Sequence, residues 1–344
     1  MSTETDTGLE IIRDAAPQVL EDTRRRVEPA LRIALERLPE SVRPVALYHY
    51  GWQDAQGNDC DAGRGKALRP ALVLLAAAAV DPSHQQERAL AAAVAVDLVH
   101  NFSLLHDDVM DGDVTRRHRA TAWSVFGVGP AVLAGDALLT LALQTLAGAP
   151  EAAAVTAEAV QELILGQIQD LAMERKPAVS LPECLAMAGS KTGALIGSSF
   201  GLGALSAAAS PQQVRLLTQA GRDLGLAFQL TDDVLGIWGD PKVTGKAAGA
   251  DLKTRKKSLP VVAALTSGTP AGRELARLYQ SPIGPAETTR AAELVEESGG
   301  RRWALQRAEE LLEEVEKALE KGNLAAEGKA GLRSLAHLCV HRQF

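Results

Sequence analysis

Two groups of carboxylates, far apart in the chain, have the residue types and spacing of a metal-binding site. The first ends an apolar stretch and reads LLHDDVMD over residues 104–111. Asp107 and Asp111 are four residues apart, so they share one face of a helix, with Asp108 beside them. Like charges this close repel one another unless a cation neutralises them. Carboxylate oxygens suit Mg²⁺, which keeps several waters and shares its shell with substrate phosphates.

A second acidic group closes another apolar stretch, where Gln229 is followed by Asp232 and Asp233. Two such groups could act on one diphosphate through bridging metal ions. A solvated acidic helix end is the simpler interpretation of either group alone. A calcium loop beginning at Asp107 is a further alternative, but its third position would be Val109, whose side chain cannot bind a metal.

Basic residues accompany both acidic groups in the chain. Lys66 and Arg69 lie at the start of an expected helix, where backbone N–H groups also favour anions. The spacing is not that of a nucleotide-binding P-loop, because its glycines and its Ser or Thr are missing. The other basic residues are Arg116 and Arg117 after the first group, then Lys191 next to Thr192, Lys246 and Lys256. Solvation of a helix start and weak surface pairing are the alternative explanations.

The elements that must position these residues are expected to be helices. Ala and Leu recur throughout while aromatic residues make up only 3% of the chain, which favours close-packed helices over strands. Apolar spacing predicts helices over residues 68–109 with a break near 81–83, then near 130–148, 151–175, 181–208, 211–238, 258–266 and 303–320. Residues 51–65 read as a loop, residues 1–15 as a flexible tail, and residues 16–344 as a single all-helical domain.

Composition excludes several classes of function. A net charge of -7 argues against a surface that binds nucleic acid, so any phosphate site must be local. Cys60, Cys184 and Cys339 have no metal-ligand spacing and read as reduced thiols. The N-terminus lacks the pattern of a secretory signal, and the apolar run 71–80 is too short to span a bilayer. We therefore expect a cytoplasmic protein without stable membrane insertion.

These motifs together resemble those of the trans-isoprenyl diphosphate synthases of the polyprenyl synthetase family, over roughly residues 45–270. The resemblance rests on GKALRP at 65–70, on His100 seven residues before the first aspartate, and on DDVMD followed by two arginines. It continues with Lys191 and Thr192, with Gln229 and the second aspartate pair, and with the segment 245–260. It implies an all-α isoprenoid synthase bundle with a central cavity, and a homodimer.

The resemblance also implies a role for each matched residue. Several Mg²⁺ ions would bind the allylic diphosphate through Asp107, Asp108, Asp111, Asp232 and Asp233. Arg116, Lys191, Lys246 and Lys256 would add positive charge to the same leaving group, with Thr192 and Gln229 near the allylic cation. Lys66, Arg69, His100 and Arg117 would hold isopentenyl diphosphate. One departure is Gly236, which stands where many relatives have the last aspartate of the second motif; Asp240 is a possible substitute.

The implied reaction is the head-to-tail condensation of isopentenyl diphosphate with dimethylallyl, geranyl or farnesyl diphosphate. Product length in such enzymes is thought to depend on residues one turn before the first motif, here Phe102 and Ser103. With Phe102 as a floor and small Ser103 leaving room, we expect geranylgeranyl diphosphate, with farnesyl diphosphate as the alternative product. A class I terpene cyclase and a non-enzymatic regulatory subunit are the rival functions. The cyclase needs no second diphosphate site, and the subunit would be expected to lose an aspartate motif.

Overall fold

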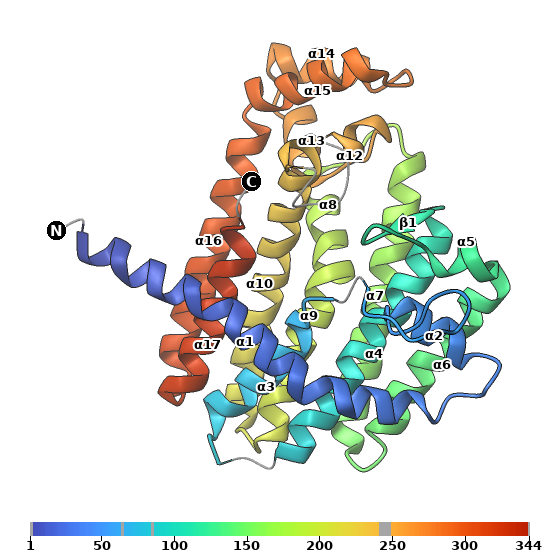
Figure 1. The fold of residues 1–344 in the computed structure, drawn as a ribbon. Coiled ribbons are helices and arrows are strands. Elements are labelled where there is room, and N and C mark those ends of the chain that lie inside the picture. The colour runs from blue at the N-terminus through green and yellow to red at the C-terminus, as the bar shows by residue number, and fades with distance from the viewer. Residues whose placement is uncertain (1–2, 63–64, 84–85, 241–248, 343–344) are drawn as a thin grey trace. The chain divides into compact units, whose positions relative to one another are not determined.

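The chain is almost entirely helical within residues 3–62, 65–83, 86–240 and 249–342, which the computed structural model describes (Figure 1). The first helices are α1 (Thr3–Leu35), α2 (Arg43–His49), α3 (Leu68–Val80), α4 (Gln86–Met110), α5 (Ala122–Phe126), α6 (Val128–Thr145) and α7 (Pro150–Arg175). They are followed by α8 (Leu181–Ala188), the π-helix η1 (Gly189–Gly193), α9 (Ala194–Ser206), α10 (Pro211–Trp238) and α12 (Ala250–Lys253). The last are α13 (Leu259–Leu265), α14 (Pro270–Leu278), α15 (Pro285–Glu297), α16 (Gly300–Lys321) and α17 (Ala326–Val340). The predicted all-α class is confirmed.

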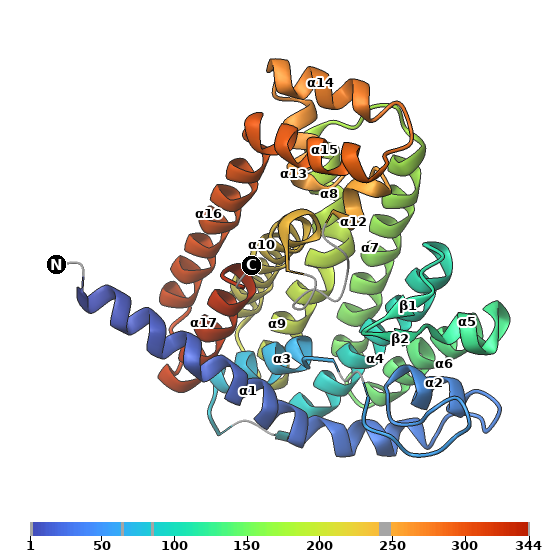
Figure 2. The same cartoon turned by 45° about the horizontal axis from the view of Figure 1, so that its top comes forward.

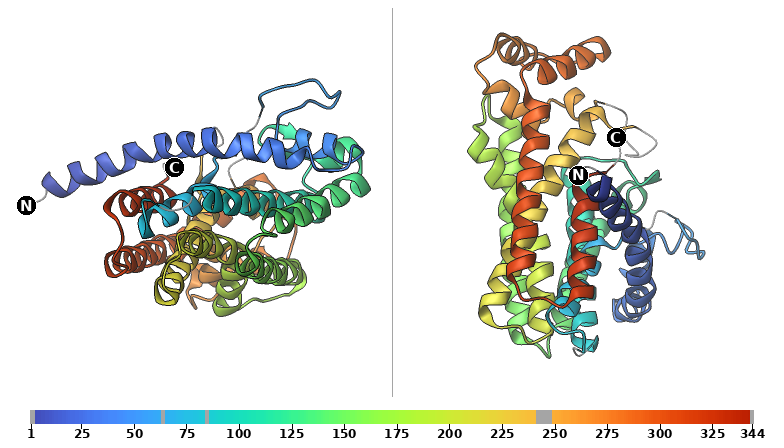
Figure 3. Two further views of the ribbon diagram at one scale, coloured as in Figure 1. Left: turned by 90° about the horizontal axis from the view of Figure 1, so that it is seen from below. Right: turned by 90° about the vertical axis from the view of Figure 1, so that its left-hand side faces the viewer.

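The chain divides into two compact units, each assembled from separate segments. Unit 1 comprises Met1–Val160, Ser198–Thr218 and Gly322–Leu335. Unit 2 comprises Gln161–Gly197, Gln219–Lys321 and Ala336–Phe344. Helix α1 begins at Thr3, within the segment expected to be a tail, and is one continuous helix (Figure 3). The flexible tail and the single domain over 16–344 stay predictions.

Unit 1 has a core of closely packed small and branched side chains. Helix α4 packs against α3 and α6, and its inward positions include Ala92, Ala93 and Ala95, which let neighbouring helices approach (Figures 1 and 2). Helices α4 and α6 are also the two described helices long and apolar enough to cross a membrane, but 67% of the apolar window in α4 is buried within the protein. Burial of that kind is typical of a core helix.

A two-stranded hairpin follows α4 in unit 1. Strand β1 (Thr115–Arg116) pairs antiparallel with β2 (Arg119–Ala120), and Arg117 and His118 form the turn with φ values of +50° and +61°. Two positive φ angles in a two-residue loop are the geometry of a type I′ turn, which matches the twist of the strands. The left-handed conformation costs about 1–2 kcal/mol for each residue with a β-carbon. The basic run after the first acidic group is therefore a tight, strained turn. The sequence did not predict this hairpin, because strands of two residues are too short to show an alternating pattern.

Unit 2 contains its own apolar core. Residues of α10, α12, α13, α14 and α15 bury a cluster that includes Ile237, Leu252, Val261, Leu275 and Leu294. Helices α14 and α15 pack on each other and on α13 (Figure 2). This cluster supports the end of α10, where the second acidic group lies.

Candidate active site

The first acidic group occupies the last turn of α4 in unit 1. Asp111 continues the helical pattern, since its N–H donates to the Asp107 carbonyl over 2.8 Å, and Gly112 then turns the chain with a φ of +68°. Asp107 is half-buried and Asp111 is exposed, whereas only 1% of Asp108 is exposed. The two carboxylates that share a helix face are therefore the accessible ones.

Asp108 pairs with the hairpin that follows the helix. Arg116 Nε donates to Asp108 Oδ1 over 2.6 Å, and no hydrogen-bond partner for Oδ2 lies among the described residues. Burial raises the pKa of the Asp108 carboxyl, and the Arg116 guanidinium opposes that rise. A predicted metal ligand and a predicted phosphate ligand are thus held together by one ion pair.

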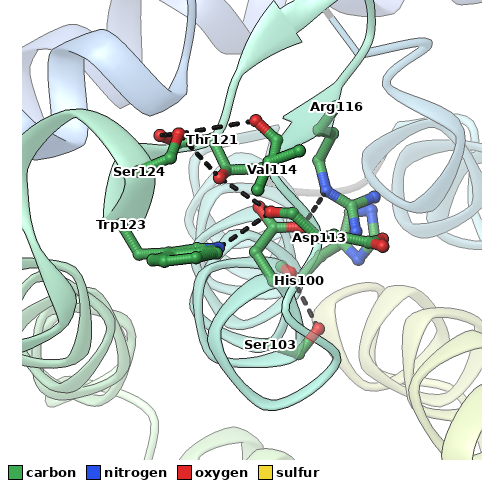
Figure 4. Close-up of polar contacts among 9 residues, drawn as sticks. His100, Ser103, Asp113, Val114, Arg116, Thr121, Trp123 and Ser124 are labelled. Carbon is green, nitrogen blue, oxygen red and sulfur yellow. Dashed lines mark hydrogen bonds and ion pairs between the residues drawn. The ribbon is translucent and has the colours of Figure 1, made fainter.

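The segment between α4 and the hairpin is tied down by the carbonyl of Asp113. This oxygen accepts hydrogen bonds from Thr121 Oγ1 and from Trp123 Nε1, each over 2.8 Å (Figure 4). Thr121 N–H in turn donates to the Val114 carbonyl over 3.1 Å. These bonds fix the point from which Arg116 reaches back to Asp108.

The predicted isopentenyl diphosphate residues also come together in unit 1. Arg69 Nη1 lies 3.2 Å from His100 Nε2, and burial, followed by the charges of Arg69 and Arg117, lowers the pKa of His100 well below its usual value. A β-carbon at Gly65 would lie 3.0 Å from Arg117 Nη2, so glycine at this position lets the guanidinium approach the loop backbone. Lys66, at the start of α3, is exposed to solvent.

A second layer of polar residues behind these arginines was missed by sequence reasoning. Asp97 accepts hydrogen bonds from Tyr50 Oη and Asn101 Nδ2, each over 3.0 Å, and burial raises its pKa to about 6. His49, with Arg117, lines a pocket, and burial together with the nearby arginines lowers its pKa to about 3. These residues precede or follow the matched motifs without any local spacing that would single them out.

The two residues predicted to set product length lie on different faces of α4. Ser103 shares a face with Asp107, four residues later, and its Oγ donates to the His100 carbonyl over 2.8 Å (Figure 4). The Phe102 ring packs edge-on against His106, with 4.8 Å between ring centroids, and is 5% exposed. His106 Nε2 lies 3.0 Å from the Val132 carbonyl, so this imidazole has a partner within the protein.

In unit 2, Lys191 and Thr192 lie in the π-helix η1. A π-helix is rare in proteins, but single turns of it occur frequently at functional sites. Two glycines make room for this wide turn: a β-carbon at Gly166 would lie 2.3 Å from Lys191 N, and one at Gly225 would lie 2.6 Å from Gly193 Cα. The close packing of three helical segments therefore supports the irregular backbone.

Hydrogen bonds join three of the predicted catalytic residues of unit 2 into one chain. Thr192 Oγ1 donates to Gln229 Oε1 over 2.7 Å, and Gln229 Nε2 donates to Asp233 Oδ1 over 2.8 Å. Asp233 Oδ2 accepts from the Leu259 N–H, also over 2.8 Å. Burial raises the pKa of Asp233 to about 6, while the charge of Lys256 and these bonds oppose the rise. Thr192 and the Gln229 amide are thereby held in a single orientation.

Lys191 has a partner that the sequence did not indicate. Its Nζ lies 2.6 Å from Asp170 Oδ2, and both side chains are mostly buried, with 23% and 19% exposure. The two residues are 21 positions apart on different helices. Asp170 therefore orients the ammonium group that the resemblance assigns to the diphosphate.

The remaining residues of the second acidic group are also contacted within unit 2. Asp232 is paired with Arg342 near the end of the chain. At Gly236 a β-carbon would lie 2.3 Å from Asp251 Oδ2, so the Asp251 carboxylate occupies the space next to the position where the motif lacks its aspartate. Lys246 falls in 241–248, outside the described residues.

The donor set fits a divalent cation that is completed by its substrate. In the described parts of the chain no three His, Cys, Asp or Glu side chains form a group that could hold a metal ion. Asp107 and Asp111 nevertheless present only carboxylate oxygens from one helix face, the chemistry that Mg²⁺ prefers with one or two protein ligands plus phosphate oxygens and water.

Known proteins match most of this chain in sequence. The pattern of the polyprenyl synthetase family matches residues 58–297. The (2E,6E)-farnesyl diphosphate synthase of Mycobacterium tuberculosis is 45% identical over 330 residues, which cover 92% of this chain and 90% of that protein. The geranylgeranyl diphosphate synthase of the same organism is also 45% identical, over 314 residues that cover 89% of each protein.

Solved structures extend the comparison to the fold. The polyprenyl synthetase from Streptomyces coelicolor A3(2) superposes with a TM-score of 0.90 at 42% identity, covering 94% of this chain and 99% of that one. The geranylgeranyl pyrophosphate synthase from Corynebacterium glutamicum, solved with isoprenyl diphosphate and magnesium, has a TM-score of 0.76 at 27% identity, covering 97% and 98%. The fold is thus that of the all-α isoprenyl synthases. The chain belongs to the polyprenyl synthetase family.

Proposed function

We propose that this protein is a magnesium-dependent, short-chain trans-prenyltransferase that condenses isopentenyl diphosphate with allylic diphosphates, with geranylgeranyl diphosphate as its main product. The observation that carries the proposal is the arrangement in unit 1. There an accessible carboxylate pair on α4 is accompanied by a separate basic group in which Arg69 contacts His100 and Arg117 contacts the loop at Gly65. A reaction of two diphosphates needs both groups.

In the proposed reaction the C–O bond of the allylic diphosphate breaks, and the diphosphate leaves with the electron pair. The allylic cation is captured by the double bond of isopentenyl diphosphate, and a proton is then lost to the released diphosphate. Arg116 and Lys191 would stabilise the negative charge that develops on the leaving group. Lys66, Arg69, His100 and Arg117 would hold the second substrate in the orientation that the new bond requires.

Magnesium would be held on the first group by Asp107 and Asp111, and on the second by Asp232 and Asp233. When bound, it neutralises negative charge on the diphosphate and so makes the diphosphate a better leaving group. The Asp108 carboxylate, with its bond to Arg116, would couple the acidic helix end to the basic hairpin. Thr192 and Gln229, oriented by their mutual hydrogen bond, would face the positive charge of the cation.

Farnesyl diphosphate is the alternative product, because relatives named for either product match this chain at 45% identity. We favour the C20 product because Ser103, on the face of Asp107, is small. A terpene cyclase would use the acidic groups without the basic group of Arg69, His100 and Arg117, so those residues favour the transferase.

Product analysis tests the proposal directly. Purified protein is incubated with labelled isopentenyl diphosphate and, separately, with dimethylallyl, geranyl and farnesyl diphosphates, with Mg²⁺ or with a chelator. We expect linear products that require Mg²⁺ and end mainly at C20. A product that ends at C15 would replace the chain-length proposal but keep the transferase. A hydrocarbon or alcohol formed without isopentenyl diphosphate would establish a cyclase instead.

We also propose that the protein is a cytoplasmic homodimer. The apolar side chains Val128 and Leu133 on α6 are 52% and 59% exposed, and burial of such side chains against a second subunit would stabilise a dimer. Light scattering after size-exclusion chromatography should give twice the monomer mass, and Leu133→Glu should shift the equilibrium toward monomer. A monomeric wild-type protein would refute this part.

A further inference from the structure

The end of the chain reaches a carboxylate of the second acidic group. In unit 2, Arg342 Nη1 lies 2.5 Å from Asp232 Oδ1. The same guanidinium lies over the Phe228 ring, 3.8 Å from its centroid. Phe228 and Asp232 are four residues apart on α10, so they share one helix face. Arg342 therefore makes both an ion pair and a cation–π contact with the face of α10 that presents Asp232.

The position of Arg342 is set by hydrogen bonds of the two residues that precede it. Thr231 Oγ1 donates to the Val340 carbonyl over 3.4 Å, and His341 Nε2 lies 2.7 Å from Glu309 Oε1 on α16. The Arg342 side chain is 20% exposed, whereas that of Asp232 is 39% exposed. The arginine is thus held by its surroundings, while the carboxylate that it contacts remains open to solvent.

A carboxylate oxygen that is paired with a guanidinium binds a metal ion less strongly, because its negative charge is partly compensated. The positive charge of the guanidinium also repels the ion. Displacing Arg342 from Asp232 is therefore a cost of loading a divalent cation there. We infer that Arg342 is a positioning residue that acts as a built-in counter-ion of Asp232, competing with the divalent cation for this carboxylate. This inference rests on the proposed function, because it takes Asp232 to be a metal ligand.

The counter-ion is expected to stabilise the second acidic group when no metal ion is bound. Asp232 and Asp233 are adjacent like charges, and Asp233 is 5% exposed. Arg342 compensates one of these charges until substrate arrives with its metal ions. Its release would then coincide with loading, so the contact at the chain end would report the state of the second acidic group.

The test measures metal binding without substrate. Mn²⁺ is titrated into the full-length protein, and the unbound ion is counted by electron paramagnetic resonance. Arg342→Gln removes the charge, and Arg301→Gln is a matched control, because Arg301 also combines an ion pair, with Glu296, and a cation–π contact, with Trp238. We expect Arg342→Gln to bind Mn²⁺ about two- to fivefold more tightly, the range of a partly exposed ion pair. Arg301→Gln should bind as the wild type does.

Two further variants separate the possible failures. Arg342→Lys keeps the charge but loses the planar contact with Phe228, so its Mn²⁺ affinity should lie between those of wild type and Arg342→Gln. Asp232→Asn should weaken Mn²⁺ binding and remove the difference between Arg and Gln at 342. Unchanged or weaker binding by folded Arg342→Gln would overturn the counter-ion inference alone. Unchanged binding by Asp232→Asn would overturn both the inference and the metal role proposed for Asp232.

Hydrogen exchange gives a readout that does not depend on activity. Addition of Mg²⁺ with inorganic pyrophosphate to the wild-type protein should speed amide exchange at residues 340–342, because the anchor at Asp232 is lost. Exchange in the same segment of Arg342→Gln should already be fast and should change little. Slower exchange in the wild type on addition would show that the arginine stays in place, against the inference.

Discussion

Replacement of Phe102 with Ala is the perturbation that bears most directly on product length. Phe102 lies five residues before Asp107, which is about 7.5 Å along the helix axis at about 1.5 Å per residue. Its ring is almost completely buried against His106. If this ring is the floor that stops chain growth, its removal opens space comparable to one isoprene unit, about one helical turn of about 5.4 Å.

The magnitude of the two expected effects can be set from the burial of the ring. Loss of a buried phenylalanine side chain costs about 3–5 kcal/mol of stability, part of it from the cavity that remains. The same cavity is what a longer chain would fill. We therefore expect the main product to lengthen by at least one isoprene unit, from C20 to C25, in a protein with a lower melting temperature.

The assay is thin-layer or mass-spectrometric analysis of products from farnesyl and isopentenyl diphosphates, with melting measured in parallel. Phe126→Ala is the control, because Phe126 also makes an edge-on aromatic contact, with Tyr48 at 5.2 Å, but lies on α5. It should lose stability and keep the product length. Ser103→Phe, on the Asp107 face, should shorten the product. An unchanged product distribution from folded Phe102→Ala would refute the role of this ring.

The other predictions concern polar and steric contacts within single units. Asp97→Asn should weaken the pH dependence of the free energy of unfolding, measured with urea, between pH 3.8, the ordinary pKa of this carboxyl, and about pH 6, the pKa of Asp97 in the folded protein. In that window the folded wild type keeps a proton that the unfolded chain releases, so wild-type stability falls as pH rises through it; an equally steep variant would contradict the assignment. Gly236→Ala should destabilise by about 1 kcal/mol, because its β-carbon would lie 2.3 Å from Asp251 Oδ2 and the Asp251 carboxylate would have to move aside. Thermal melting should show partial recovery in Gly236→Ala/Asp251→Ala, and no recovery would place the strain elsewhere. Thr192→Val should cost about 1–3 kcal/mol and lower kcat, since the Gln229 acceptor loses its donor; an unchanged kcat would remove Thr192 from the catalytic group.

The helices that carry the site were predictable because their signal is local. Apolar spacing over 68–109 and the break near 81–83 correspond to α3 and α4, and the predicted helix over 211–238 is α10. Amphipathic spacing and turn residues are properties of neighbouring residues, and tertiary packing here reinforced them. The acidic and basic residues were recognisable for a similar reason, since each short motif keeps its own spacing.

Contacts that packing creates were not predictable in this way. The stretch 181–208 was expected to be regular helix, but it contains the π-helix at 189–193, which depends on Gly166 and Gly225 in other helices. Asp170, the partner of Lys191, is separated from it by 21 residues and resembles any acidic residue of a surface helix. Only the three-dimensional arrangement distinguishes such a residue from a solvated charge.

The departure of the second acidic motif from the family pattern now has a steric explanation. A side chain at position 236 would collide with the Asp251 carboxylate, which already fills that space, so glycine and Asp251 form a complementary pair. Asp251 lies in α12, and its carbonyl accepts a hydrogen bond from the Lys256 N–H over 2.8 Å, which ties it to another predicted diphosphate residue. Asp240 stays a possible substitute for the missing aspartate, as the sequence indicates. The structure adds Asp251, 15 positions after Gly236, as a carboxylate next to this glycine. The Gly249 N–H donates to the Ile237 carbonyl over 3.2 Å, which holds the start of α12 against α10.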